Sequence, residues 1–218
     1  MILYIDARWG ISGDRALAAM KDLGLPGRGL REAFQPLAKF RNRAVPRKAN
    51  EILRWVESFS MDRPIRRRTL QALKTLIRAE AKAHGVPSAQ VHFHQLARPD
   101  TLESFIGFAA GLVHFRIKRV HVSPIRVGNF HRDPHGFVRH RPGPATVELL
   151  KTFPVRWMKD EVEWTTPTGA ALVSAFAVPG PFRFFEVRRI GTAASRARNG
   201  RGAAMGFLLG EPLRNIHA

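Results

Sequence analysis

The segment Val91-His92-Phe93-His94-Gln95 opens the stretch from Val91 to Thr146 around which this chain is organised. Apolar and imidazole side chains alternate in the segment, which predicts a β-strand, because successive side chains of a strand point to opposite faces. His92 and His94 would then share one face, with Asp100 close behind them in the chain. Imidazole and carboxylate groups are metal ligands, so the pattern predicts a metal site. The alternative is a pair of strand histidines at a polar surface, because His-x-His is a short pattern.

Short apolar segments and amphipathic helical patterns alternate along the rest of the chain. Strands are expected at residues 2–6, 120–122, 161–164, 184–188 and 204–209. Helices are expected at residues 14–23, 50–60, 66–84, 100–115, 144–152 and 168–176, with a loop at 123–141. This alternation predicts an α/β or α+β fold with a mixed β-sheet layered with helices. Residues 1–218 are expected to form a single region, and the basic, weakly periodic residues 27–49 are the best candidate for a linker.

The charge balance of the chain is strongly basic. Thirty-six Lys and Arg residues against 17 Asp and Glu residues give a net charge of +19. Such an excess favours nucleic acid, a nucleotide or an acidic protein partner. The candidate anion-binding residues lie at the start of one predicted helix and in the predicted loop: Arg66, Arg67, Arg68, Arg126, Arg132, Arg139 and Arg141. The alternative is an arginine-rich composition that only decorates the surface, which explains the preference for arginine but not the shortage of acids.

Residue usage also limits the chemistry and the compartment. The chain has no cysteine, which excludes disulfides, thiolate metal sites and cysteine nucleophiles. A bound metal would therefore need imidazole, carboxylate or an external sulfur ligand. No apolar run reaches the length of a membrane span, and the N-terminus lacks the basic leader of a signal peptide. We therefore expect a cytoplasmic protein.

A glycine-rich turn, Gly10-Ile11-Ser12-Gly13, separates Asp6 at the end of the first predicted strand from Asp14 at the start of the first predicted helix. The two carboxylates could approach each other across this turn and take part in metal or phosphate chemistry. The alternative is that Asp14 only caps the helix. Both interpretations stay open at the level of the sequence.

Several short motifs follow one another in a fixed order along the chain. They are Met1-Ile-Leu-Tyr-Ile-Asp6, Gly10-Ile-Ser-Gly-Asp14, Glu80-Ala-Lys-Ala-His84-Gly85, Val91-His-Phe-His94, Ser123-Pro124, Pro144-Ala-Thr146, Glu148-Leu-Leu-Lys151 and Thr166-Pro-Thr-Gly-Ala-Ala171. Together they resemble the LarC family, from Met1 to about Glu211. Members of that family insert nickel into a pyridinium bisthiocarboxylate mononucleotide, which makes the nickel-pincer cofactor of lactate racemase and related enzymes.

The resemblance implies a function and a set of site residues. It implies a nickel-inserting lyase, or a subunit of one, that acts on pyridinium-3,5-bisthiocarboxylic acid mononucleotide. The metal would be held by His92, His94 and Asp100. The pincer nucleotide precursor would be bound by four further residues, of which the last matches the family's histidine-glycine pair: Asp6, Ser12, Asp14 and His135.

The chain also departs from the family pattern, mainly by losing acids. Gln95 and Ser104 stand where the family has acidic residues, and Arg15 stands where it has methionine. The usual histidine-rich linker is replaced by basic residues, and a C-terminal domain associated with CTP is not recognisable. CTP with Mg²⁺ or Mn²⁺ would then come only from a separate subunit of that type. The open alternative is a non-catalytic scaffold whose basic surface binds RNA, DNA or an acidic protein complex.

Overall fold

The computed structural model describes residues 1–38, 46–93, 98–128, 130–132, 138–140, 142–159, 162–180, 185–195 and 203–213. Its helices are α1 (Gly13–Asp22), α2 (Gly27–Ala38), α3 (Ala49–Glu57), α4 (Arg63–His84), α5 (Pro99–His114), α6 (Pro144–Leu149) and α7 (Pro167–Phe176), with a short 3₁₀ turn at Ser88–Gln90. Its strands are β1 (Ile2–Asp6), β2 (Arg119–Val122), β3 (Ile125–Val127), β4 (Phe130–Arg132), β5 (Val138–His140), β6 (Val155–Trp157), β7 (Ala177–Pro179), β8 (Phe185–Ser195) and β9 (Ala203–Pro212).

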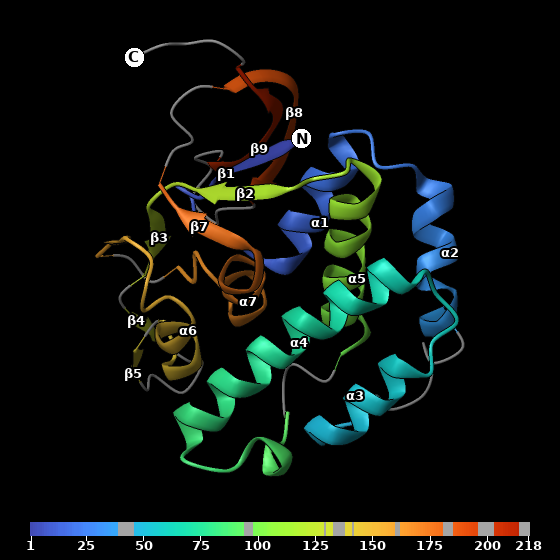
Figure 1. The fold of residues 1–218 in the computed structure, drawn as a ribbon. Coiled ribbons are helices and arrows are strands. Elements are labelled where there is room, and N and C mark those ends of the chain that lie inside the picture. The colour runs from blue at the N-terminus through green and yellow to red at the C-terminus, as the bar shows by residue number, and fades with distance from the viewer. Residues whose placement is uncertain are drawn as a thin grey trace.

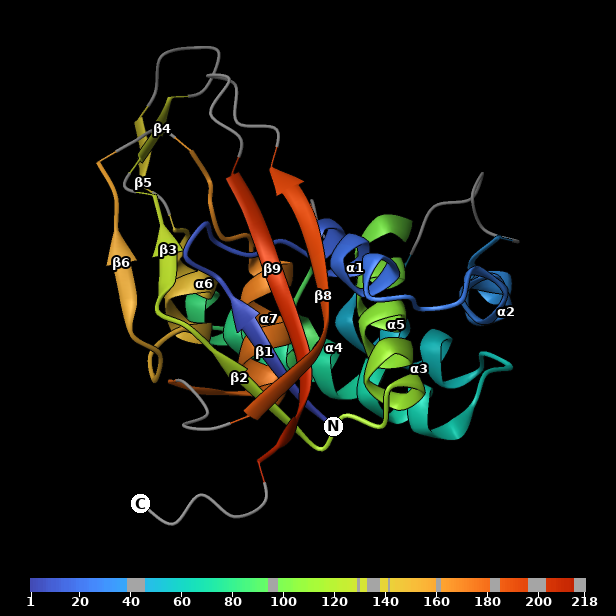
Figure 2. The same ribbon diagram turned by 90° about the horizontal axis from the view of Figure 1, so that it is seen from above.

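The main sheet has five strands in the order β7-β2-β1-β9-β8. Strand β1 is rich in apolar and aromatic residues, which favour β-structure. It lies in the centre of the sheet, where it pairs in parallel with β2 and antiparallel with β9. The sheet is therefore mixed, and the predicted α/β class is confirmed. Helices α1, α5 and α7 cover one face of this sheet, as Figure 2 shows. In the described ranges, no helix combines the length and apolar character needed to cross a bilayer.

The long helix α4 crosses the molecule and packs against α5, α6 and α7 (Figure 1). Helix α5 is apolar over most of its surface because other helices surround it. Gly107 and Gly111 let α1 approach α5 closely, since a Cβ atom at either position would overlap Leu17 or Met20. The helical layer is therefore packed tightly enough to fix where the helix ends lie.

The N-terminal parts of α1, α5 and α7 converge on one point. A Cβ atom at Gly13 would lie 2.6 Å from Thr168 Cγ2 and 2.8 Å from the Ser104 hydroxyl. A Cβ atom at Gly169 would overlap the Ile11 carbonyl. Glycine is required at both positions because three helix starts meet there.

The structure corrects several local predictions. The predicted loop 123–141 contains strands β3, β4 and β5, while residues 162–164 form no strand. Strand β3 pairs with β6, which was not predicted, because three residues are too few to show a period. Residues 91–93 make a single isolated bridge, from His92 to Lys48, instead of a full strand. The first part of the candidate linker forms α2, whose Leu30, Ala33 and Leu37 are buried.

Candidate metal and substrate cleft

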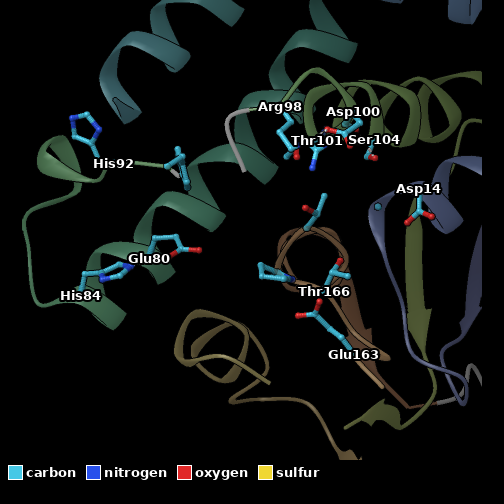
Figure 3. A pocket seen from close by; sticks show the side chains of 14 residues that line it. Asp14, Glu80, His84, His92, Arg98, Asp100, Thr101, Ser104, Glu163 and Thr166 are labelled. Atoms are coloured by element: carbon cyan, nitrogen blue, oxygen red, sulfur yellow. Dashed lines mark hydrogen bonds and ion pairs between the residues drawn. The ribbon is translucent and has the colours of Figure 1, made fainter. Parts of the chain in front are cut away.

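A cleft of about 510 Å³ lies where the three converging helix starts meet the C-terminal end of α4. Figure 3 shows the side chains that line it. They are Gly13, Asp14, Glu80, His84, His92, Phe93, Arg98, Asp100, Thr101, Ser104, Glu163, Thr166, Pro167 and Thr168. The cleft is therefore built from residues that lie far apart in the chain.

Carboxylates dominate the charge of this cleft. The lining includes Asp14, Glu80, Asp100 and Glu163. Arg98 is the arginine of the lining, and its Nε lies 3.6 Å from Asp100 Oδ1. The chain as a whole carries a charge of +19, so a local excess of acids contrasts with its composition. Such a concentration of acids attracts cations.

Glu80 and His84 form an acid–imidazole pair on α4. The spacing of four residues places both side chains on one face of the helix, with Glu80 Oε2 3.4 Å from His84 Nε2. The Glu80 side chain is 14% exposed and His84 is 65% exposed. Burial raises the pKa of the Glu80 carboxyl, and His84 partly opposes that rise. Figure 3 shows the Glu80 carboxylate directed toward the middle of the cleft.

The helix starts supply hydrogen-bond donors to the same space. Thr101 and Thr168 are 9% and 7% exposed, and neither hydroxyl makes a hydrogen bond with another described residue. Thr166 differs, because its hydroxyl accepts from the Gly169 N–H at 3.2 Å. Ser12, the N-cap residue of α1, makes no capping hydrogen bond through its side chain. Backbone N–H groups at helix starts bind anions, so this part of the cleft suits an oxyanion.

The structure brings only some of the predicted site residues to the cleft. Asp14, His92 and Asp100 line it, and Figure 3 shows His92 well apart from the two aspartates. Asp14 lies in the first turn of α1, after the N-cap Ser12, and Asp100 follows the N-cap Arg98. Among the described residues, no three His, Asp or Glu side chains are close enough to hold a metal ion together.

The side chains of Asp6 and Ser12 accept hydrogen bonds from arginines. The Asp6 carboxylate accepts hydrogen bonds from Arg8, whose Nη2 lies 2.6 Å from Oδ2, and this contact lowers the pKa of Asp6. The Ser12 hydroxyl accepts from Arg15 Nε at 3.0 Å. Neither residue lines the cleft. His94, His135 and Arg141 lie outside the described residues, as do the side chains of Arg132 and Arg139.

Two arginines stabilise residues 9–15, a segment that includes the cleft residues Gly13 and Asp14. The buried Arg15 guanidinium also donates to the carbonyls of Trp9 at 2.9 Å and Trp164 at 2.6 Å, and burial lowers its pKa. The Arg126 guanidinium carbon lies 4.4 Å from the Trp9 ring centroid and 3.9 Å from that of Trp164. Cation–π contact of this kind stabilises both rings, so Arg126 and Arg15 tie the turn to residues 162–166.

The predicted arginine run on α4 lies at the other end of that helix. Arg66 Nη1 donates to the Phe59 carbonyl at 3.1 Å, and Arg68 Nη1 donates to the Pro64 carbonyl at 3.3 Å. Arg67 and Arg68 line a second, smaller hollow. The three arginines therefore take no part in the acidic cleft.

The sequence interpretation missed several cleft residues, namely Glu80, His84, Thr101, Glu163, Thr166 and Thr168. The spacing of Glu80 and His84 was the available signal, because residues four apart share a helix face. Nothing local distinguishes Glu163, which reaches the cleft only through the folding of the chain.

Comparison with known proteins points to one family. A model of the nickel insertion protein family matches residues 38–211. One relative, from Syntrophobacter fumaroxidans, is named as a nickel insertion protein and is 35% identical over 212 residues. The match covers 86% of this chain and 54% of the relative.

Two further relatives carry a more detailed name, pyridinium-3,5-bisthiocarboxylic acid mononucleotide nickel insertion protein. The relative from Desulfitobacterium hafniense is 32% identical, over 88% of this chain and 54% of its own length. The relative from Staphylococcus saprophyticus is 29% identical, over 87% of this chain and 54% of its own length. The chain thus spans about half the length of these relatives. No solved structure matches it.

Proposed function

We propose that this chain, which belongs to the nickel insertion protein family, takes part in inserting nickel into pyridinium-3,5-bisthiocarboxylic acid mononucleotide at the cleft beside the C-terminal end of α4. The observation that carries this proposal is the gathering of four carboxylates in one cleft of a chain with a charge of +19. A metal cation and a positively charged pyridinium ring are both attracted to such a site.

The chemistry of the substrate defines what the cleft must do. The two thiocarboxylates flank one ring carbon, so a metal held by both sulfur atoms lies next to the C–H bond of that carbon. When nickel bonds to the carbon, the C–H electron pair becomes the nickel–carbon bond and the proton leaves. The oxidation state of nickel does not change. The site therefore needs a cation-attracting surface, a proton acceptor and donors for the anionic groups.

Asp14, His92 and Asp100 supply the cation-attracting surface in this proposal. We add His94 to this surface from the sequence alone. Because no three described ligands gather, protein side chains would guide nickel and the sulfur atoms of the substrate would complete its coordination. This division of labour requires no preformed metal cage.

Glu80 is the proton acceptor in this proposal. Its carboxylate is the more enclosed member of the Glu80–His84 pair, and a raised pKa makes it a stronger base than an ordinary glutamate. The exposed His84 imidazole lies 3.4 Å away and can pass the proton to solvent. The pair therefore provides a route from the ring carbon to water.

The helix starts bind the anionic groups of the substrate in this proposal. Thr101 and Thr168 hold hydroxyls in the first turns of α5 and α7, next to the N-terminus of α1 at Gly13. A phosphate or thiocarboxylate bound there would accept hydrogen bonds from hydroxyl and backbone N–H groups. Arg98 adds positive charge beside them.

The test measures nickel binding by isothermal titration, with and without the mononucleotide substrate, and with CTP and Mg²⁺ or Mn²⁺ in a further arm. We expect tighter nickel binding when the substrate is present, because substrate sulfur completes the coordination. The double variant Asp14→Asn/Asp100→Asn should weaken binding about tenfold, because it removes two cleft charges. The matched control Glu57→Gln/Glu186→Gln removes two exposed charges outside the cleft and should have little effect. Equal loss in both variants, or no nickel binding in any arm, contradicts the proposal.

A further inference from the structure

A second hollow of about 230 Å³ lies beside the N-terminal part of α4. Its polar lining consists of Arg67, Arg68, Gln71 and Lys118, and Phe176 belongs to its apolar wall. At 1.5 Å per residue, Arg67 and Glu80 lie about 20 Å apart along α4. The hollow is therefore separate from the acidic cleft.

The cations of this hollow lack counter-ions in the described part of the chain. Neither Arg67 nor Lys118 makes a side-chain hydrogen bond or an ion pair with a described residue. Arg68 donates only to the Pro64 carbonyl, at 3.3 Å. The described lining includes no carboxylate. Three like charges around one hollow repel one another, so the arrangement is unfavourable unless an anion joins it.

The surrounding helices offset little of this charge. The N-terminal end of a helix is its positive end, and the first turn of α4 holds no acidic residue. The carbonyl end of α7 also reaches the hollow, but the Ala175 carbonyl already accepts from Gln71 Nε2 at 2.7 Å. Helix ends therefore do not explain why these cations gather.

We propose that this hollow is an oxyanion site that binds the phosphate group of a small phosphorylated ligand. Arginine forks match the geometry of phosphate oxygens, and Lys118 adds a mobile point charge. The buried Leu112 and Ile117 form a low-polarity floor, which strengthens each charge interaction. A concave site with three cations suits one phosphate group better than a nucleic acid backbone, which needs a track of contacts.

The test is titration of the whole chain with inorganic phosphate, pyrophosphate, a ribonucleoside monophosphate and a short single-stranded RNA, followed by isothermal calorimetry. We expect the three small phosphates to bind at one site per chain. The double variant Arg67→Gln/Lys118→Gln should bind them about tenfold more weakly, because each replaced cation removes a charge-assisted hydrogen bond.

The matched control is Arg31→Gln/Arg54→Gln, which makes the same change in net charge on exposed positions of α2 and α3. It should bind the small phosphates as the wild type does, and circular dichroism checks that both variants stay folded. Equal weakening in both variants would show diffuse charge attraction and overturn the proposal. No binding of any small phosphate, or RNA binding that falls about a thousandfold between roughly 50 and 200 mM salt, would overturn it too. None of these outcomes depends on nickel insertion, so the two proposals fail separately.

Discussion

The two ends of helix α4 border hollows of opposite charge: the acidic cleft at its C-terminal end and the basic hollow at its N-terminal part. Arg66, Arg67 and Arg68 lie toward the N-terminal end, which is the positive end of the helix dipole. Glu80 lies toward the C-terminal end, which is the negative one. Lys82 and His84, in the last turn, have the sign that the dipole favours. The three arginines and Glu80 are placed against the dipole, which destabilises a helix, so their placement points to ligands: a cation near Glu80 and an anion near the arginines.

The acidic end should respond most strongly to loss of its base. Glu80→Gln keeps the shape of the side chain but removes the proton acceptor, so nickel insertion should slow by about 100-fold. Product formed over time, measured by mass spectrometry at several pH values, checks this. The exposed Glu57→Gln is the control and should keep the wild-type rate. An unchanged rate in Glu80→Gln would show that Glu80 is not the proton acceptor.

The shape of the acidic cleft depends on Arg15, which ties Trp9 to Trp164. Arg15→Ala deletes hydrogen bonds to the Trp9 and Trp164 carbonyls and should lower the free energy of unfolding by about 2 kcal/mol. Arg8→Ala is the control, since Arg8 is 72% exposed and its ion pair should contribute less than about 1 kcal/mol. Urea unfolding measures both. Similar losses in the two variants would show that the shape of the cleft does not depend on Arg15.

The pH dependence of stability tests Glu80 without any ligand. The folded protein raises the pKa of Glu80 above its ordinary 4.5, so the unfolded chain ionises first and stability falls as pH rises through that interval. Glu80→Gln lacks this titration. Its stability relative to wild type should therefore rise from pH 4 to pH 8. Urea unfolding measures the free energy of unfolding of both proteins at the two pH values. An equal difference between them at both pH values would contradict a raised pKa of Glu80.

The smallest effect concerns the basic end. Arg63 opens α4 and does not line the hollow, so Arg63→Glu should raise stability by about 0.5 kcal/mol by matching the helix dipole. Phosphate binding should stay near the wild-type level. If this variant instead lost phosphate binding as fully as Arg67→Gln/Lys118→Gln, the whole helix end, and not the hollow, would hold the anion.

Most helices and the central strands followed from the sequence, because their apolar spacing reports burial directly, whereas α2 was expected as part of a linker. The apolar stripe of α4 and the run of β1 are examples. Strands β3 and β6 did not follow, because their pairing joins distant segments of three residues.

The candidate site was predictable to a similar degree. Asp14 and Asp100 were expected at a site and do line the cleft. Arg126 was expected to bind anions, and its guanidinium packs against two indole rings supplied by distant turns. Only tertiary packing reveals that contact, just as it reveals Glu163 in the cleft.

The cluster of Trp9, Arg126 and Trp164 gives the protein an internal optical reporter. Two of the four tryptophans of the chain lie in this cluster, and Trp164 directly follows the cleft residue Glu163. Paramagnetic nickel quenches nearby indole emission, and a moved guanidinium changes the local field that sets its wavelength. Occupation of the cleft can therefore be followed by the intrinsic fluorescence of the unlabelled chain, and Trp157→Phe, at a residue that is 57% exposed, lowers the background.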